Sequence, residues 1–258
     1  MASYQSVLRG SKKTFGISGG LLKLFALLMM TLDHFAVIII HNGKLYGFIQ
    51  EYYDMAVATP EGQWWLKLYE VFRIFGRLSF PVFAFLLVEG FLHTQNFWKY
   101  FSRVLFFALL SEVPYDIALY NEIYNFQKQN TLFTLATGLL VMYCMKRCRK
   151  HPELKWLSVI AGMAVAEFGR LDYGALAVLM IALMYNFHKE KTLMIASGVI
   201  ISIIDSLDLY GFAALSFLLI WFYNGERGRF HFKWLSYIYY PLHLILFFVM
   251  IYIGAQLT

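Results

Sequence analysis

The sequence predicts an all-α fold, a polytopic transmembrane helix bundle of about nine spans with the N-terminus inside and the C-terminus outside. Three observations lead to this class: the composition, the length of the apolar segments and the placement of the basic residues. The chain of 258 residues is 60% hydrophobic and only 15% charged. Soluble domains carry about 25% charged residues, so this balance is typical of a membrane protein.

The apolar segments set the number of spans. A transmembrane helix needs about 20 largely apolar residues. Segments of about this length are predicted at 21–40, 77–95, 98–120, 131–147, 154–169, 171–188, 191–206, 208–223 and 235–255. We therefore expect residues 21–258 to form a single transmembrane domain. Residues 1–20, rich in Ser, Gly and Lys, are expected to form a mobile basic tail. No small-x-small cleavage site follows the first span, so it is expected to be retained.

The basic residues set the orientation. With the N-terminus inside, sixteen of the 22 lysines and arginines fall at the cytoplasmic ends of the spans, and six fall at the outer ends. This asymmetry follows the positive-inside rule. The net charge of +6 is then explained by loops that face anionic lipid. We expect membrane lipid as a partner, and no nucleic acid.

The longest segment outside the spans covers residues 41–76. Its second half places Trp64, Trp65, Leu68, Phe72 and Phe75 at helical spacing. Charged residues fall on the other side of the same helix. This pattern predicts an amphipathic helix that lies at the membrane interface before the second span.

The first span carries Asp33 and His34. At 1.5 Å per residue, His34 lies about 20 Å from the cytoplasmic start, past the midplane. Consecutive helical residues point about 100° apart, so a hydrogen bond between Asp33 and His34 is not assumed. Ionisable residues at this depth usually mark function. His34 is a candidate general base or acyl relay, with Asp33 setting its charge state. The alternative is a polar pair that joins helices.

Arg73 and Arg77 are four residues apart and share one helix face. They could hold a carboxylate or phosphate, or stabilise an oxyanion. They could instead be interface arginines paired with Glu70. Gly76 between them permits close approach of another helix, and Pro81 is expected to kink the second span.

Glu89 and His93 share a face near the cytoplasmic end of the second span. Such a pair can contribute to a metal site, but no second pair accompanies it, so no metal is expected. A hydrogen-bonded structural or relay pair is favoured. In the third span, Glu112 and Asp116 flank Pro114, which is expected to break the helix. These carboxylates could line a polar cavity open outward, or cap the helix or pair with Arg170.

The densest basic cluster, Lys146 to Lys150, lies at a cytoplasmic end. It could be a topological anchor or a seat for the phosphates of a cytoplasmic cofactor. Asp172 lies at the outer start of a span, where a carboxylate suits a helix N-terminus. His243 follows Pro241 in the last span and is a second deep histidine.

These residues resemble the TraX family. The similarity rests on ordered motifs that extend from residue 23 to residue 243, nearly the whole chain. They are Lys23 to Asp33-His34; Arg73-Ile-Phe-Gly76-Arg77 through Pro81 to Glu89-Gly90-Phe-Leu-His93-Thr94; Lys99-Tyr100-x-x-Arg103; Glu112-Val-Pro114-Tyr115; Asp172-Tyr173-Gly174; and Tyr240-Pro241-x-His243.

The resemblance implies a multi-pass protein of the bacterial cytoplasmic (inner) membrane that acts as an acetyltransferase. Acetyl-CoA would be the cytoplasmic donor. The acceptor at the outer face would be a peptide N-terminus such as that of pilin, or another amine or hydroxyl. The alternative is a non-enzymatic small-molecule transporter or a membrane assembly partner, although no inverted repeat favours a transporter.

Under the enzymatic hypothesis, His34 is the general base and His243 a second candidate base or acyl carrier. Asp33 or Glu89 would orient the base, and Arg73 or Arg77 would stabilise the oxyanion. The expected binding residues, including the CoA phosphate ligands Arg103, Arg147 and Lys150, are His93, Arg103, Glu112, Tyr115, Asp116, Asp172, Tyr240, Arg147 and Lys150.

Overall fold

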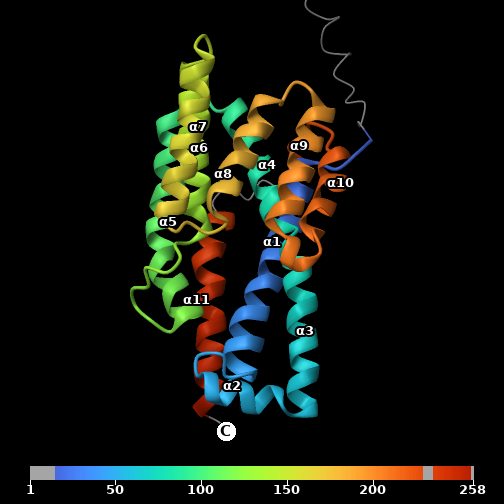
Figure 1. Cartoon of the computed structure of the whole chain (residues 1–258), viewed down its shortest axis with the longest axis vertical. Coiled ribbons are helices and arrows are strands. Elements are labelled where there is room, and N and C mark those ends of the chain that lie inside the picture. The colour runs from blue at the N-terminus through green and yellow to red at the C-terminus, as the bar shows by residue number, and fades with distance from the viewer. Residues whose placement is uncertain (1–14, 229–234, 257–258) are drawn as a thin grey trace, which may run out of the picture.

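The computed structural model describes residues 15–228 and 235–256, and over these residues the chain is helical with short connections. The first rod consists of α1 (Gly19–Phe35) and a π-helical continuation, η1 (Ala36–Lys44). The short helix α2 (Gln50–Val57) follows at the far end of this rod (Figure 1). The helix α3 (Pro60–Gly76) then returns along α1 and η1, and α4 (Ser79–His93) extends it.

The middle of the chain forms a series of neighbouring helices. They are α5 (Phe97–Tyr120), α6 (Thr131–Arg147), α7 (Pro152–Phe168), α8 (Gly174–Asn186) and α9 (Lys191–Asp205). Each of them packs against the next in the chain. Two short 3-10 turns, η2 (Leu207–Leu209) and η3 (Phe212–Leu215), lead to α10 (Ser216–Trp221). The last helix, α11 (Leu235–Gln256), packs against α5 and η1.

Within the described residues, three helical stretches are long and apolar enough to cross a membrane: Gly19–Lys44, Pro60–His93 and Ser236–Gly254. The other apolar helices are shorter than a standard span. The predicted all-α class is therefore confirmed, and at least three candidate spans support a membrane protein. The nine-span count stays a prediction.

Most predicted segments form helices with nearly the predicted bounds, but 208–223 does not form one helix. Tyr210 and Gly211 adopt positive φ angles of 61° and 67°, which end regular helix. The chain there splits into η2, η3 and α10. The predicted break at Pro114 is also wrong, because α5 continues through it. A proline removes only one helical hydrogen bond, whereas a broken helix in an apolar layer exposes several unpaired backbone groups.

Three further predictions concern the first two spans. The π-helix η1 carries the first rod to Lys44, four residues beyond the predicted end. The segment expected to lie flat at the interface is instead α3, which packs along α1 and η1 (Figure 1). Pro81 lies in the first turn of α4, where its missing N–H costs no intrahelical bond. Regular helix is interrupted just before it, at Arg77 and Leu78, between α3 and α4.

The predicted tail at 1–20 is described only from Phe15 onward, and residues 1–14 lie outside the described part. Ile17 N donates to Phe222 O at 2.8 Å, and the Ser18 side chain caps α1. These contacts fix the start of α1 against the residues that follow α10.

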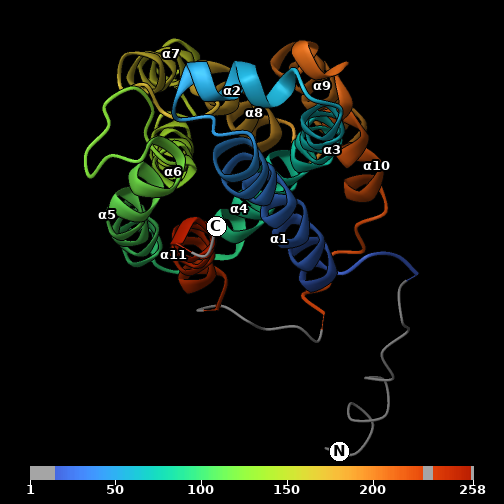
Figure 2. The ribbon, with the colours of Figure 1, turned by 90° about the horizontal axis from the view of Figure 1, so that it is seen from below.

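The described residues form three clusters of buried side chains; two of them include α1, and the third joins α6, α7 and α8. The larger cluster of buried side chains joins α1, α4, α6, α8, α9 and α10. A smaller cluster joins α1 and η1 to α5 and α11. Seen from below, α1 and α4 lie near the centre and the other helices form an arc around them (Figure 2). Polar side chains on the inner faces of α1, α3 and α11 therefore meet between the two clusters that include α1.

Candidate functional site

Asp33 and His34 point to different partners, as their 100° separation predicts. Arg73 Nη1 lies 2.6 Å from both carboxylate oxygens of Asp33 and donates to them. The side chains of Arg73 and Asp33 are only 20% and 14% exposed, respectively. This ion pair joins α3 to α1, so Arg73 is paired with Asp33 rather than with Glu70.

Gly76 makes the approach of these two helices possible. An added Cβ at this position would overlap the side chain of Asp33, including its carboxylate. Gly76 is the last residue of α3 and is buried. The glycine that the sequence marked as a close-approach position therefore lies directly against the ion pair.

His34 bonds to His243. Its Nδ1 lies 2.7 Å from His243 Nε2, and both residues are buried. His243 Nδ1 in turn lies 2.7 Å from the backbone oxygen of Tyr239. A carbonyl only accepts, so His243 Nδ1 carries the hydrogen. With both rings neutral, His243 Nε2 must accept the hydrogen of His34 Nδ1.

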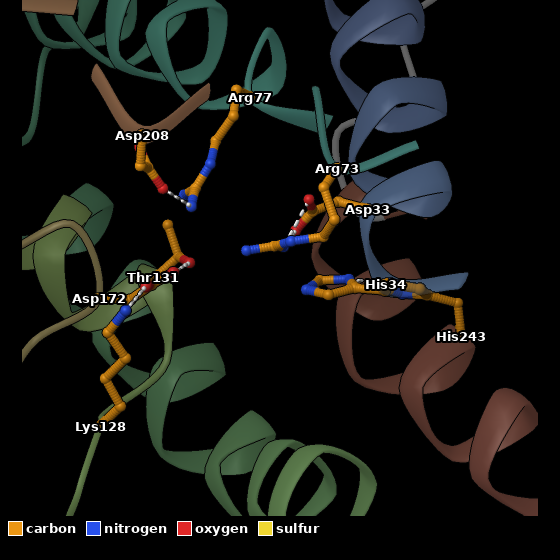
Figure 3. Close-up of polar contacts among 9 residues, drawn as sticks. All are labelled: Asp33, His34, Arg73, Arg77, Lys128, Thr131, Asp172, Asp208 and His243. Atoms are coloured by element: carbon orange, nitrogen blue, oxygen red, sulfur yellow. Dashed lines mark hydrogen bonds and ion pairs between the residues drawn. The ribbon is translucent and has the colours of Figure 1, made fainter. Parts of the chain in front are cut away.

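This order leaves His34 Nε2 with a lone pair and no hydrogen. Among the described residues no hydrogen bond to this nitrogen is present. Figure 3 shows the ring of His34 directed into the space between Arg73 and Thr131, away from His243. The structure therefore distinguishes the two histidines: His34 presents a basic nitrogen, and His243 orients it.

The space in front of His34 is a cavity of about 240 Å³, here called the central cavity. Its charged and basic lining consists of Asp33, His34, His41, Arg73, Arg77, Lys128 and Asp172. A narrower, mainly apolar extension of about 70 Å³ leads from His34 past Met30 and Leu27. It follows α1 back toward its N-terminal end, which is cytoplasmic in the predicted orientation.

Asp172 forms the wall opposite His34 (Figure 3). Its carboxylate accepts from Thr131 Oγ1 at 2.7 Å and lies 3.2 Å from Lys128 Nζ. Two backbone bonds hold it there, from Gln129 N to Arg170 O and from Asp172 N to Gln129 O. The loops before α6 and α8 thus form a short paired segment that fixes the carboxylate.

Arg77 lies at the outer side of this wall. Its guanidinium packs over the Tyr173 ring at 5.7 Å and lies 3.8 Å from Asp208 Oδ2. Its buried Nε has no hydrogen-bond partner within the described part of the chain. Arg77 also lines a more open pocket of about 370 Å³ that shares Lys128, Asp172 and Tyr173 with the central cavity. The two pockets therefore adjoin each other at these polar residues.

Two other predicted binding residues reach this site. Tyr115 lines the central cavity. Tyr240 lines the apolar extension, and its ring lies edge-on to His34 at 5.9 Å.

Glu89 and His93 lie elsewhere. His34 lines the extension together with Ser79, and Glu89 is ten residues further along α4, about 15 Å away. Glu89 accepts from Tyr223 Oη at 3.2 Å and lies 3.9 Å from His93 Nδ1. The expectation that Glu89 orients His34 is therefore wrong, because the rise of α4 separates them.

Glu112 and Asp116 do not line the central cavity; they anchor the loop between α5 and α6. Asp116 accepts from the backbone N of Asn125 at 3.0 Å, and Glu112 accepts from the backbone N and the side chain of Asn130. The prediction of a polar cavity at these carboxylates is wrong. They do not pair with Arg170 either, whose side chain donates to Phe126 O.

The expected CoA ligands lie at the other end of the molecule. Arg147 lines a pocket of about 430 Å³ with Lys146, Arg149 and the rings of Phe97 and Tyr143. These two rings stack 4.2 Å apart. Lys150 is exposed beside this pocket but does not line it. Arg103 lies between the rings of Tyr100 and Tyr237, on α5 and α11, at 5.6 Å from each.

His41, Lys128 and Thr131 also contact or line the site, although they are not among the predicted site residues. His41 follows the predicted end of the first span, so it was placed in a loop. In a regular α-helix a spacing of seven residues from His34 returns to nearly the same face, and that signal in the sequence could have found it. No group of three or more His, Cys, Asp or Glu side chains in the described ranges could hold a metal ion.

Comparison with known proteins identifies the family of the chain and a relative. Residues 18–251 match the family model described as TraX protein. A curated protein described as "Probable fimbrial assembly protein FimC, serogroup H1", from Dichelobacter nodosus, is 29% identical over 249 residues. That alignment covers 87% of this chain and 92% of the relative. No solved structure matches the chain.

Proposed function

Because the chain belongs to the TraX family, we propose that it is an integral-membrane acetyltransferase of the bacterial inner membrane. It moves an acetyl group from cytoplasmic acetyl-CoA to an acceptor amine at the outer face. The relative's description as a fimbrial assembly protein supports pilin as the acceptor. The observation that carries the proposal is the free Nε2 of His34, held toward a polar cavity by His243.

The transfer needs a base and a nucleophile. His34 Nε2 removes a proton from the acceptor nitrogen as that nitrogen forms a bond to the thioester carbonyl carbon. The carbon–sulfur bond then breaks, and its electron pair leaves on the CoA sulfur. The sulfur takes the proton from His34, which returns to its starting state. His243 keeps His34 in the correct tautomer throughout, because its Nε2 accepts from His34 Nδ1.

The developing oxyanion needs positive charge close to His34. The guanidinium of Arg73 points across the central cavity beside the His34 ring (Figure 3). Its pairing with Asp33 fixes its direction before the substrate arrives, and such preorganised charge is where electrostatic catalysis gains most. Arg77 supplies a second cation at the outer wall.

The donor is proposed to enter from the cytoplasmic end. The pocket of Lys146, Arg147 and Arg149 combines cations with stacked aromatic rings, a combination that suits the phosphates and the adenine of CoA. The apolar extension beside Tyr240 and Met30 suits the thinner arm that carries the acetyl group. We expect Arg147→Glu to weaken the thermal stabilisation by CoA, and Arg170→Glu at the other end to leave it unchanged.

The proposal is tested with the purified full-length chain in detergent. Radiolabelled acetyl-CoA is supplied with a synthetic peptide that has the N-terminal sequence of the source bacterium's mature pilin, and peptide-bound label is measured. Thermal unfolding with and without CoA is measured in parallel. A ligand that binds only the folded state stabilises it by about 2.7 kcal/mol at one hundred times its Kd. No transfer and no stabilisation would instead favour a transporter or assembly role.

A further inference from the structure

His34 alone does not account for every proton that acetylation of a peptide amine releases. A peptide α-amine has a pKa of about 7.8 and is largely an ammonium ion at neutral pH. Acetylation of an ammonium releases two protons from nitrogen. His34 returns one of them to the CoA sulfur. The other must leave before the nitrogen can attack, because an ammonium has no lone pair.

Most of the bases that line the central cavity are already paired or protonated. Asp33 is paired with Arg73, and Asp172 with Lys128 and Thr131. The tyrosines that line it are ordinarily protonated near neutral pH. The remaining base in the lining is a second histidine, His41.

His41 also presents a free Nε2. The side-chain nitrogen of Asn42 donates to the backbone oxygens of Ala118 and Leu119, at 3.3 and 3.2 Å. The side-chain oxygen of Asn42 therefore faces His41 Nδ1, at 2.9 Å, and accepts its hydrogen. Neutral His41 then carries a lone pair on Nε2, and no hydrogen bond to this atom is present among the described residues.

The ring of His41 is held in place by its neighbours. It packs between the rings of Tyr53 and Tyr69, at centroid distances of 5.3 and 5.4 Å. A Cβ added at Gly47 would overlap it, so the 45–49 turn also fits closely around it. His41 lies seven residues after His34 on the same rod, at most about 10 Å further outward in the predicted orientation.

The titratable and charged groups around His41 come from each element packed against it. α2 contributes Tyr53, α3 contributes Tyr69 and Arg73, α5 contributes Tyr115 and Tyr120, and the loop before α6 contributes Lys128. The face of α11 that meets η1 there carries Ile251. The same cavity also holds the carboxylates of Asp33 and Asp172, each already paired with a cation, and Asp54 and Glu70 lie near Tyr53. No ion pair between His41 and a carboxylate is present among the described residues, so a proton accepted by His41 is not held by a salt bridge.

We propose that His41 is a second catalytic base, which takes the first proton from the acceptor's ammonium group and releases it to the outer side. The resulting amine then attacks the thioester while His34 takes the second proton. This inference rests on the proposed acetyl transfer and adds that the enzyme uses the cationic form of an amine acceptor.

The test compares the wild type, His41→Gln and His151→Gln in the full-length protein. His151 is an exposed histidine in the turn between α6 and α7 and serves as the matched control. The kcat/KM for the pilin peptide is measured from pH 6.5 to pH 9. A parallel series uses an analogue with a 2-hydroxy acid in the first position, which has no ammonium group.

The expected result follows from the fraction of free amine. At pH 6.5 about one twentieth of the amine is unprotonated, so His41→Gln should lose about twentyfold in kcat/KM. At pH 9 its rate should approach that of the wild type, and the hydroxyl acceptor should show no defect at any pH. His151→Gln should match the wild type throughout.

A defect of equal size at both pH values, or with both acceptors, overturns the inference and assigns His41 a structural role. The absence of any defect overturns it as well. In either case the proposed acetyl transfer stands if the wild type transfers acetyl. If the wild type transfers none while remaining folded, the proposed function fails, and this inference with it.

Discussion

At the residue scale, neighbouring polar side chains of the first rod point in different directions and meet different partners. Asp33 pairs with an arginine on α3, and His34 forms a hydrogen bond with a histidine on α11. Helical geometry predicts that the two neighbours diverge, but not which partners they meet. Arg73 is 40 residues from Asp33 in sequence, and His243 is 209 from His34. Such distant pairings depend on how the helices pack, which one sequence does not specify.

The Asp33–Arg73 pair should stabilise the protein as well as shape the site. Asp33→Asn leaves a largely buried guanidinium without its counterion, and breaking a buried pair typically costs about 3–5 kcal/mol. The partial exposure of both side chains places the expected loss near the lower end. We expect a clearly lowered thermal midpoint. The exposed pair His151–Glu153 provides the control, because Glu153→Gln should change the midpoint little.

Gly76 permits the close approach of α1 and α3. Gly76→Ala would force the new methyl group into Asp33, so we expect both the thermal midpoint and acetyl transfer to fall. Gly254→Ala on α11 is the matched control, since an added Cβ there meets nothing within 4 Å. Equal behaviour of the two variants in both measurements would show that α1 and α3 do not approach as described.

At the scale of elements, the apolar segments predicted the helices well because their length and hydropathy are local properties. Three features were not predicted from these properties. The π-helix η1 packs against α3 and α11, and these contacts are distant in sequence. The turn at Tyr210 and Gly211 depends on two left-handed residues. The continuity of α5 through Pro114 depends on the cost of exposing backbone groups, which outweighs one missing hydrogen bond.

The start of α6 offers a prediction at this scale. Asn130 caps the helix by accepting from Leu132 N, and its side-chain nitrogen donates to Ala108 O and to Glu112. Asn130→Ala should cost about 1 kcal/mol for the cap and more for the buried acceptors that lose a donor. Asn96→Ala removes the exposed cap of α5 and should cost only about 1 kcal/mol of stability, for the cap alone. Thermal unfolding of the two variants side by side measures the difference.

At the scale of the whole molecule, the two ends carry different chemistry. The turn between α6 and α7 and the basic pocket lie toward one end, and α2 lies at the other (Figure 1). The distribution of lysine and arginine predicted this polarity. The composition could not predict that the polar site lies between two clusters of buried side chains, since that arrangement comes from packing.

This polarity predicts opposite labelling of two single cysteines in intact cells. In a background with Cys144 and Cys148 replaced by serine, Glu153→Cys should react with a membrane-impermeant maleimide only after the membrane is opened. Met55→Cys on α2, at a position that is 63% exposed, should react from outside. Labelling of both from the same side would contradict the predicted orientation.

The central claim is that His34 is the base and His243 its orienting partner. The most direct measurement is the initial rate of acetyl transfer by His34→Gln, His243→Gln and His243→Leu, each shown to be stabilised by CoA. His34→Gln should lose at least about a hundredfold. His243→Gln should lose much less than His243→Leu, because a glutamine oxygen can still accept from His34 Nδ1. A full rate in His34→Gln, or an equal loss in His34→Gln and His243→Gln, would contradict this assignment.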